Sequence, residues 1–283
     1  MNSWLLAARL KTLSAAIVPV LMGTALAWPR ISWPLFACTL GGAVLIQIAT
    51  NFINDALDFK KGADTGERLG PLRVTQAGLL SADAVMRGAW ICLAGAAACG
   101  VPLILRGGWP LLAIGLASIA MAYAYTGGPF PLAYHGLGEL FVLLFFGVIA
   151  VGGTFYVQTL TVTRESMLTG FAAGSLATVL IVINNLRDID SDRRSRKWTL
   201  AAQHGESFAR QQVMIFALLP FIVVFRLTWL SLAALPIALL VILCASRSRG
   251  AALNRCLGIA GALQWAFGIL FVVGWICGFG VTR

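Results

Sequence analysis

Long apolar segments separated by short polar stretches follow one another along all 283 residues of the chain. Within each segment the apolar residues are nearly continuous and not confined to one helical face, which is typical of helices surrounded by lipid. Each segment is about long enough to cross a hydrocarbon layer of ~30 Å. We therefore predict an all-α, polytopic membrane protein that forms a single domain over residues 1–283, with nine transmembrane helices near residues 13–29, 34–56, 84–105, 109–126, 137–159, 167–187, 209–227, 229–245 and 255–279.

The charged residues are distributed unequally between the two sides of the predicted membrane. With the N-terminus inside, sixteen of the 21 Lys and Arg residues fall on the inner side, as the positive-inside rule predicts. Joining the two spans that Arg226 separates would move Arg247, Arg249 and Arg255 outside, so this distribution favours nine spans. The net charge of +10 then reflects topology and attraction to anionic lipid or substrate, and we expect no nucleic-acid partner.

Two further features are interpreted as parts of the membrane domain. Arg9 and Lys11 precede an apolar run, as in a signal peptide, but removing this stretch would upset the charge asymmetry, so we expect it to be the first span. The six cysteines lie in or beside apolar spans without C-x-x-C spacing. We expect them to be small buried apolar side chains, not metal ligands or disulfides.

Seven of the eleven acidic residues fall in two clusters, and both clusters begin at the inner end of an even-numbered predicted span. Each contains the step N-x-x-x-D, from Asn54 to Asp58 and from Asn184 to Asp188, which places both residues on one helix face. We expect the clusters to face one another as halves of a weak internal repeat. Their acidic members are Asp55, Asp58, Asp64 and Glu67 in the first cluster, and Asp188, Asp190 and Asp192 in the second.

The clusters could be solvated helix ends, but their composition favours a metal site. A carboxylate at membrane depth costs roughly 2.5–3.5 kcal/mol on insertion scales, and such groups are functional candidates by default. Carboxylate and amide oxygens without nearby His or Cys suit Mg²⁺, which completes its coordination with water and substrate phosphate oxygens. Basic residues that could pair with the remaining phosphate charge are Lys60, Lys61, Arg68, Arg73, Arg187 and Lys197. The sequence thus predicts a lipid diphosphate bound through Mg²⁺.

The two motifs, "NDALD" (54–58) and "NLRDIDSD" (185–192), resemble the signatures of the UbiA superfamily of intramembrane aromatic prenyltransferases. Within it, four stretches are most similar to the branch that prenylates 1,4-dihydroxy-2-naphthoate in menaquinone synthesis: residues 8–23, 58–81, 125–158 and 184–201. The resemblance implies a helical bundle around a central cavity. It also implies transfer of a polyprenyl group from polyprenyl diphosphate to the naphthoate, with loss of CO₂ and diphosphate, to give demethylmenaquinol.

The resemblance also implies a role for individual residues. Two Mg²⁺ ions would lie between the motifs with the diphosphate, contacted directly or through water by Asn54, Asp55, Asp58, Asp64, Asn185, Asp188 and Asp192. Side chains expected to bind the diphosphate are Lys60, Arg68, Arg73, Arg187 and Lys197. Of all these, Asp58, Asp188, Lys197 and Arg73 are the expected catalytic residues, because they would stabilise the charge of the departing diphosphate.

The loop at residues 125–136 contains no Lys or Arg, unlike the other inner loops. Its Gly-Gly-Pro and Phe-Pro steps are typical of a tight connection. It could also cover the site, with Tyr125, Tyr134 and His135 near the aromatic acceptor. For His135, a role in satisfying the loop is an alternative to a role as a base.

Other functions remain open at this stage. Another acceptor, 4-hydroxybenzoate or homogentisate, is the main alternative within the superfamily. An ion-coupled transporter is a more remote one, because its acids would lie near the membrane midplane and not at one face with basic residues. The charge distribution and the resemblance favour a bacterial inner membrane, with the site open to the cytoplasm.

Overall fold

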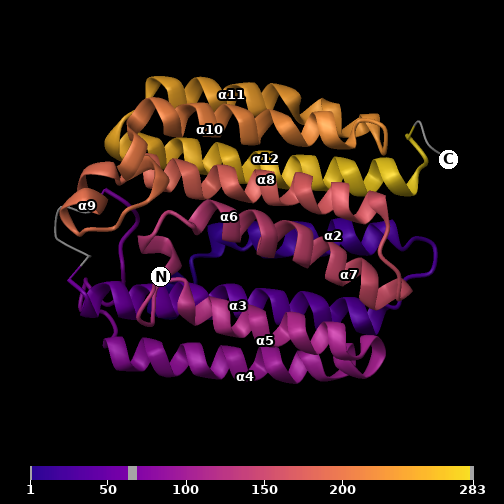
Figure 1. The fold of residues 1–283 in the computed structure, drawn as a ribbon, viewed down its shortest axis with the longest axis horizontal. Coiled ribbons are helices and arrows are strands. Elements are labelled where there is room, and N and C mark those ends of the chain that lie inside the picture. The colour runs from indigo at the N-terminus through magenta and orange to yellow at the C-terminus, as the bar shows by residue number, and fades with distance from the viewer. Residues whose placement is uncertain (1, 63–68, 281–283) are drawn as a thin grey trace.

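The computed structural model describes residues 2–62 and 69–280. This part of the chain is helical and contains no strand. Its long helices run roughly parallel or antiparallel in one bundle (Figure 1). At one side of the bundle lie α3, α4 and α5, at the other lie α8, α10, α11 and α12, and α2, α6 and α7 lie between them (Figure 1).

The helices follow the apolar segments of the sequence closely. In chain order they are α1 (Ser3–Ala8), η1 (Leu10–Thr12), α2 (Ser14–Leu26), α3 (Trp33–Lys60), α4 (Ala82–Gly107), α5 (Trp109–Ala124), η2 (Leu132–Tyr134), α6 (Gly138–Leu143), the π-helical turn η3 (Leu144–Ile149), α7 (Ala150–Thr159), α8 (Arg164–Arg187), α9 (Ile189–Arg194), α10 (Leu200–Val224), η4 (Trp229–Ala234), α11 (Leu235–Arg247), η5 (Gly250–Ala252) and α12 (Leu253–Ile276).

Seven of the described helical segments are long and apolar enough to cross a membrane. An eighth is obtained if residues 3–12 and α2, which are bent by 50° relative to each other, form one span. The remaining apolar helix, α5, has only 16 residues. The prediction of an all-α membrane protein is therefore confirmed, while the count of nine spans is not.

Helix α8 is more buried than the other long helices of the described residues, and it carries the second motif at its C-terminal end. It begins after a capping box in which the Thr163 and Ser166 side chains each accept a hydrogen bond from the other residue's backbone N–H. Its neighbours approach very closely, because a Cβ on Gly174 would lie 2.3 Å from the backbone oxygen of Leu143. Glycine in α8 thus allows α6 and η3 to pack directly on its backbone.

Two hydrophobic clusters form the core, one around α8, α10 and α12 and the other around α3 and α4. Between them is an apolar cavity of about 530 Å³, lined mainly by residues of α2 to α8. We call it the apolar cavity. It agrees with the central cavity expected from the sequence.

One expectation about the cysteines is wrong. Cys244 in α11 and Cys256 in α12 form a disulfide, with their Cα atoms 5.7 Å apart. The short turn η5 brings α12 back against α11, so two cysteines twelve positions apart in the sequence meet at the helix ends. Their spacing alone gave no sign of this, because it depends on how the two helices are connected.

Candidate active site

Residues from both predicted motifs line a second, polar pocket of about 160 Å³. It opens where α3 and α8 both end, and we call it the polar pocket. Arg9, Asn54, Tyr125, Ile181 and Asn184 line both the polar pocket and the apolar cavity, so the two spaces adjoin. A ligand with a charged head and a long apolar tail would fit this arrangement.

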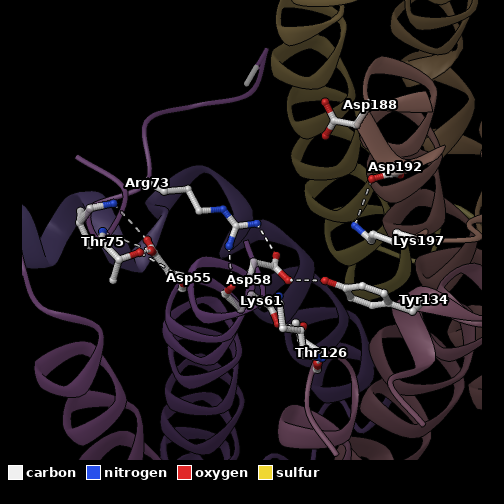
Figure 2. A network of polar contacts seen from close by, with 12 residues as sticks. Asp55, Asp58, Lys61, Arg73, Thr75, Thr126, Tyr134, Asp188, Asp192 and Lys197 are labelled. Carbon is white, nitrogen blue, oxygen red and sulfur yellow. Dashed lines mark hydrogen bonds and ion pairs between the residues drawn. The ribbon is translucent and has the colours of Figure 1, made fainter. Parts of the chain in front are cut away.

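In the first motif, Asp58 is buried at the end of α3 and faces the loop that follows. One of its oxygens accepts a hydrogen bond from Arg73 Nη2 at 2.7 Å, and the other accepts one from Tyr134 Oη at 3.2 Å (Figure 2). Arg73 also donates from Nη1 to the backbone oxygen of Asn54 at 2.5 Å. The first motif therefore presents a carboxylate and a guanidinium together at the pocket.

Asp55 makes a different set of contacts. Its carboxylate accepts hydrogen bonds from the backbone N–H groups of Val74 and Thr75, at 3.2 and 3.3 Å, and from the Thr75 hydroxyl (Figure 2). Asp55 is 1% exposed and does not line the polar pocket. In this structure it binds the loop after α3.

In the second motif, Asp188 follows the last residue of α8 and forms a bidentate ion pair with Arg187. Arg187 Nε and Nη2 donate to its two oxygens at 2.8 and 2.6 Å. Arg187 also donates from Nη1 to Asn254 Oδ1 on α12 at 2.8 Å. The neighbouring Asn185 donates to the buried Glu139 Oε1 at 2.9 Å.

Asp192, on α9, is buried although it is charged in its ordinary state. Its nearest basic group, Lys197 Nζ, is 3.6 Å away, and the Thr199 hydroxyl donates to it at 3.3 Å. Burial raises the pKa of Asp192 to about 6; Lys197 opposes this shift and the Asp188 carboxylate adds to it. The charge of Asp192 is thus incompletely compensated in the protein alone.

Basic and aromatic side chains connect the two motifs. Lys61 Nζ lies 4.7 Å from the ring centroid of Tyr134, and Lys197 Nζ lies 5.9 Å from it. Lys61 also donates to the backbone oxygen of Thr126 at 2.5 Å. Trp198 N–H donates to the Tyr134 backbone oxygen at 3.0 Å, so the loop at 125–136 lies against the second motif.

Some predicted site residues lie elsewhere or are not described. Lys60 forms an exposed ion pair with Asp83 at 2.7 Å and does not line the polar pocket. His135 is exposed, its ring stacks on Phe130, and its Nδ1 lies 2.8 Å from the Pro131 oxygen, contacts that belong to the loop itself. Asp64 and Arg68 lie outside the described residues.

The other predicted residues converge. Those that line the polar pocket are Asn54, Asp58, Arg73, Tyr125, Tyr134, Asn185, Arg187, Asp188, Asp192 and Lys197.

Sequence reasoning missed several residues at the site. Arg9 lines the polar pocket and has a left-handed backbone, with φ of 50°. Its charge was attributed only to topology. The Thr126 hydroxyl donates to Asn54 Oδ1. Glu139 and Asn254 contact the second motif from other helices, and no local pattern marked them.

The oxygen ligands fit a hard divalent cation only if other ligands complete the set. Within residues 2–62 and 69–280, no three acidic, His or Cys side chains come close enough to hold a metal ion by themselves. Asp58 and the pair Asp188 and Asp192 instead lie on opposite sides of the pocket (Figure 2). Mg²⁺ commonly takes one or two carboxylates and completes its coordination with water and phosphate oxygens, which such an arrangement allows.

The chain is similar in sequence to known prenyltransferases over most of its length. The chain is 38% identical over 244 residues to a 1,4-dihydroxy-2-naphthoate octaprenyltransferase of Mycobacterium tuberculosis, covering 83% of each chain. It is 41% identical over 218 residues to the Escherichia coli protein of the same name, covering 74% of this chain and 71% of that one.

Solved structures share the fold at lower sequence identity. A UbiA homolog from Archaeoglobus fulgidus bound to DMAPP and Mg²⁺ has a TM-score of 0.65 at 16% identity, covering 96% of this chain and 99% of that one. A homolog from Aeropyrum pernix has a TM-score of 0.71 at 18% identity, covering 94% and 98%. The model of the UbiA prenyltransferase family matches residues 16–255, and the chain belongs to this family.

Proposed function

We propose that the protein transfers a polyprenyl group from polyprenyl diphosphate to 1,4-dihydroxy-2-naphthoate, releasing diphosphate and CO₂ and forming demethylmenaquinol. The observation that carries this proposal is the junction of the polar pocket with the apolar cavity, in a chain 38–41% identical to naphthoate octaprenyltransferases. The diphosphate would occupy the polar pocket. The prenyl chain and the naphthalene ring would occupy the apolar cavity.

Asn54, Asp58, Asn185, Asp188 and Asp192 are the described residues that would hold Mg²⁺. When bound with the diphosphate, Mg²⁺ would neutralise charge on the leaving group. In support, structural relatives were solved with Mg²⁺ and either DMAPP or GPP. Asp55 shares this motif, but its contacts in the structure are with the loop.

The basic side chains of the pocket have a direct role in the reaction. As the bond between the allylic carbon and the diphosphate oxygen breaks, its electron pair leaves with the diphosphate. Arg73 and Lys197 line the pocket from opposite sides and can donate to the oxygens that gain this charge. Both already contact carboxylates, so they are held close to the position where the charge develops.

The apolar cavity protects the carbon that loses the diphosphate. Its lining includes Phe141, Phe145 and Phe146, whose rings can stabilise an allylic cation while water is excluded. The carboxyl-bearing ring carbon of the naphthoate forms the new bond to this cation. The carboxylate then leaves as CO₂, and its bonding electrons restore the aromatic ring.

The location of the pocket adds to the proposal. The acids lie at one end of the bundle and have basic neighbours, which suits an anionic substrate better than an ion path through the membrane. We place this end at the cytoplasmic face of a bacterial inner membrane, in accord with the positive-inside distribution.

The experiment is an acceptor panel with purified protein, Mg²⁺ and a long-chain polyprenyl diphosphate. We expect a prenylated, decarboxylated product from 1,4-dihydroxy-2-naphthoate, detected by mass spectrometry, and none after chelation of the metal. Preferential conversion of 4-hydroxybenzoate or homogentisate would contradict the proposed acceptor. Full turnover in metal-free buffer would contradict the proposed metal site.

A further inference from the structure

Asp55 belongs to the first motif by sequence, but its carboxylate is directed at a loop. Three hydrogen bonds reach its two oxygens, from the N–H groups of Val74 and Thr75 and from the Thr75 hydroxyl. The Thr75 hydroxyl also lies 3.2 Å from the Asp55 backbone oxygen. With all these donors from one loop, the carboxylate is committed to protein contacts.

The residue before Val74 in this loop is Arg73, which lines the polar pocket. Its guanidinium reaches the Asn54 backbone oxygen and the Asp58 carboxylate, one residue before and three residues after Asp55 on α3. One turn of α3 therefore fixes three consecutive loop residues, and only the first of them faces the pocket. Val74 is fully buried in the hydrophobic cluster around α3 and α4, and this packing also holds the loop in place.

We propose that Asp55 is a positioning residue that holds Arg73 in place for the diphosphate, and that it is not a metal ligand. This inference rests on the proposed function, since it requires a diphosphate in the polar pocket. The rigid attachment matters because placing the guanidinium requires order in both the backbone and the side chain of Arg73, and a backbone that is already fixed leaves only the side-chain part of the entropy cost. Asp55 supplies that fixed backbone through charge-assisted hydrogen bonds.

The variant Asp55→Asn tests the proposal while keeping the shape of the side chain. Its amide oxygen can still accept one loop N–H, but its NH₂ group opposes the other donors. We expect the KM for polyprenyl diphosphate to rise about tenfold, as for the loss of one charge-assisted hydrogen bond. We expect kcat to fall as well, because Arg73 also donates to the charge that develops on the leaving group, while the Mg²⁺ concentration for half-maximal activity at saturating diphosphate should stay within twofold of wild type.

A double-mutant cycle with Arg73→Gln identifies the route of the effect. If Asp55 acts through Arg73, Asp55→Asn adds less than twofold to the KM of Arg73→Gln. Asp83→Asn is the matched control, because Asp83 is an exposed acid that pairs with Lys60 outside the pocket, and it should leave the KM unchanged. A large rise in the Mg²⁺ requirement of Asp55→Asn, or effects that multiply in the double variant, would overturn the proposal.

A second variant keeps the test valid if Asp55→Asn does not fold. Thr75→Val removes only the hydroxyl donor to Asp55 and keeps the side-chain size, and it should also raise the KM for the diphosphate, by a smaller factor. An unchanged KM in Thr75→Val would then count against the proposal. Calorimetric measurement of polyprenyl diphosphate binding to the wild-type protein separates the proposed function from the proposed role of Asp55. Binding without naphthoate turnover contradicts the proposed acceptor alone, and absence of binding contradicts both proposals.

Discussion

Replacing Asp192 by Asn should separate function from stability. Replacing a residue that is kept for folding lowers the stability of the protein. Asp192, in contrast, is a buried acid whose pKa is raised to about 6 by burial, so its charged form costs the folded protein stability. We expect Asp192→Asn to lose most of its prenylation rate, by roughly 10²–10³-fold, as for the loss of one group that stabilises transition-state charge. We also expect the metal-free variant to be at least as stable as wild type.

The magnitude follows from the pKa. Between its ordinary value of 3.8 and the folded-state value of about 6, the folded protein binds more protons at Asp192 than the unfolded chain does, so stability falls as pH rises through this window. Above about pH 6 the charged Asp192 lowers the free energy of unfolding by its full amount, and about two pKa units correspond to roughly 3 kcal/mol. Asn removes this cost while its amide oxygen can still accept from Thr199.

The assay is thermal unfolding in detergent at pH 7.5 and at pH 4.5, with and without Mg²⁺ and diphosphate, together with the prenylation rate. The gain of the metal-free variant should be present at pH 7.5 and largely absent at pH 4.5, where wild-type Asp192 is protonated. The matched control is Asp190→Asn, since Asp190 is an exposed residue of the same helix that does not line the pocket. A variant that turns over at the wild-type rate, or that loses stability and activity in proportion, would refute the reasoning.

Two further predictions concern the contacts around the pocket. Asp58→Asn and Asp188→Asn should each lower the prenylation rate roughly 10²–10³-fold. Because both residues would act on one bound diphosphate, the loss in the double variant should be far smaller than the product of the two single losses. Losses that multiply in steady-state measurements would contradict a shared site. Asp58→Asn should also unfold at a lower temperature, because its buried ion pair with Arg73 is broken. Asn254→Ala should raise the KM for polyprenyl diphosphate several-fold, because it removes the hydrogen-bond acceptor that holds Arg187. Asn254→Asp keeps an acceptor for Arg187 and should retain most of the wild-type affinity. An equal rise in KM in both variants would argue against a role of Asn254 in holding Arg187.

Much of the fold followed from the sequence, because lipid imposes a simple rule on it. Backbone groups in a membrane must be paired internally, so each long apolar run becomes a helix. The rule does not decide where a helix bends. Residues 3–12 and α2 meet at 50° after Arg9 adopts a left-handed backbone, and α5 is too short to count as a span by length alone. The bend and the length of α5 depend on packing between helices, and they are the reason why the structure has seven or eight candidate spans among its described residues where the sequence predicted nine.

The site was predictable to the extent that its residues lie on one helix face. Asn54 and Asp58, and Asn184 and Asp188, are four positions apart, and all four line the polar pocket. Asp55 comes between them in sequence, but it points to another side of α3 and meets the loop. The contributions of Asn254 and Glu139 were not predictable, because they reach the site from helices far away in the chain and carry no motif.

The charges of the pocket explain why two motifs and a metal would act together. Asp58 is paired with Arg73 and Asp188 with Arg187, while Lys197 compensates Asp192 only in part, so each of these carboxylates already has a basic neighbour before any substrate binds. A diphosphate brings several negative charges into this space, and it can attract the basic side chains only by competing with the acids that hold them. A divalent cation held by Asp58, Asp188 and Asp192 would resolve this competition, because the acids would then no longer need the basic side chains, whose donors would be left for the leaving group. Under the proposed function, the acid and the base of each of these three ion pairs would therefore serve different parts of the same bound substrate.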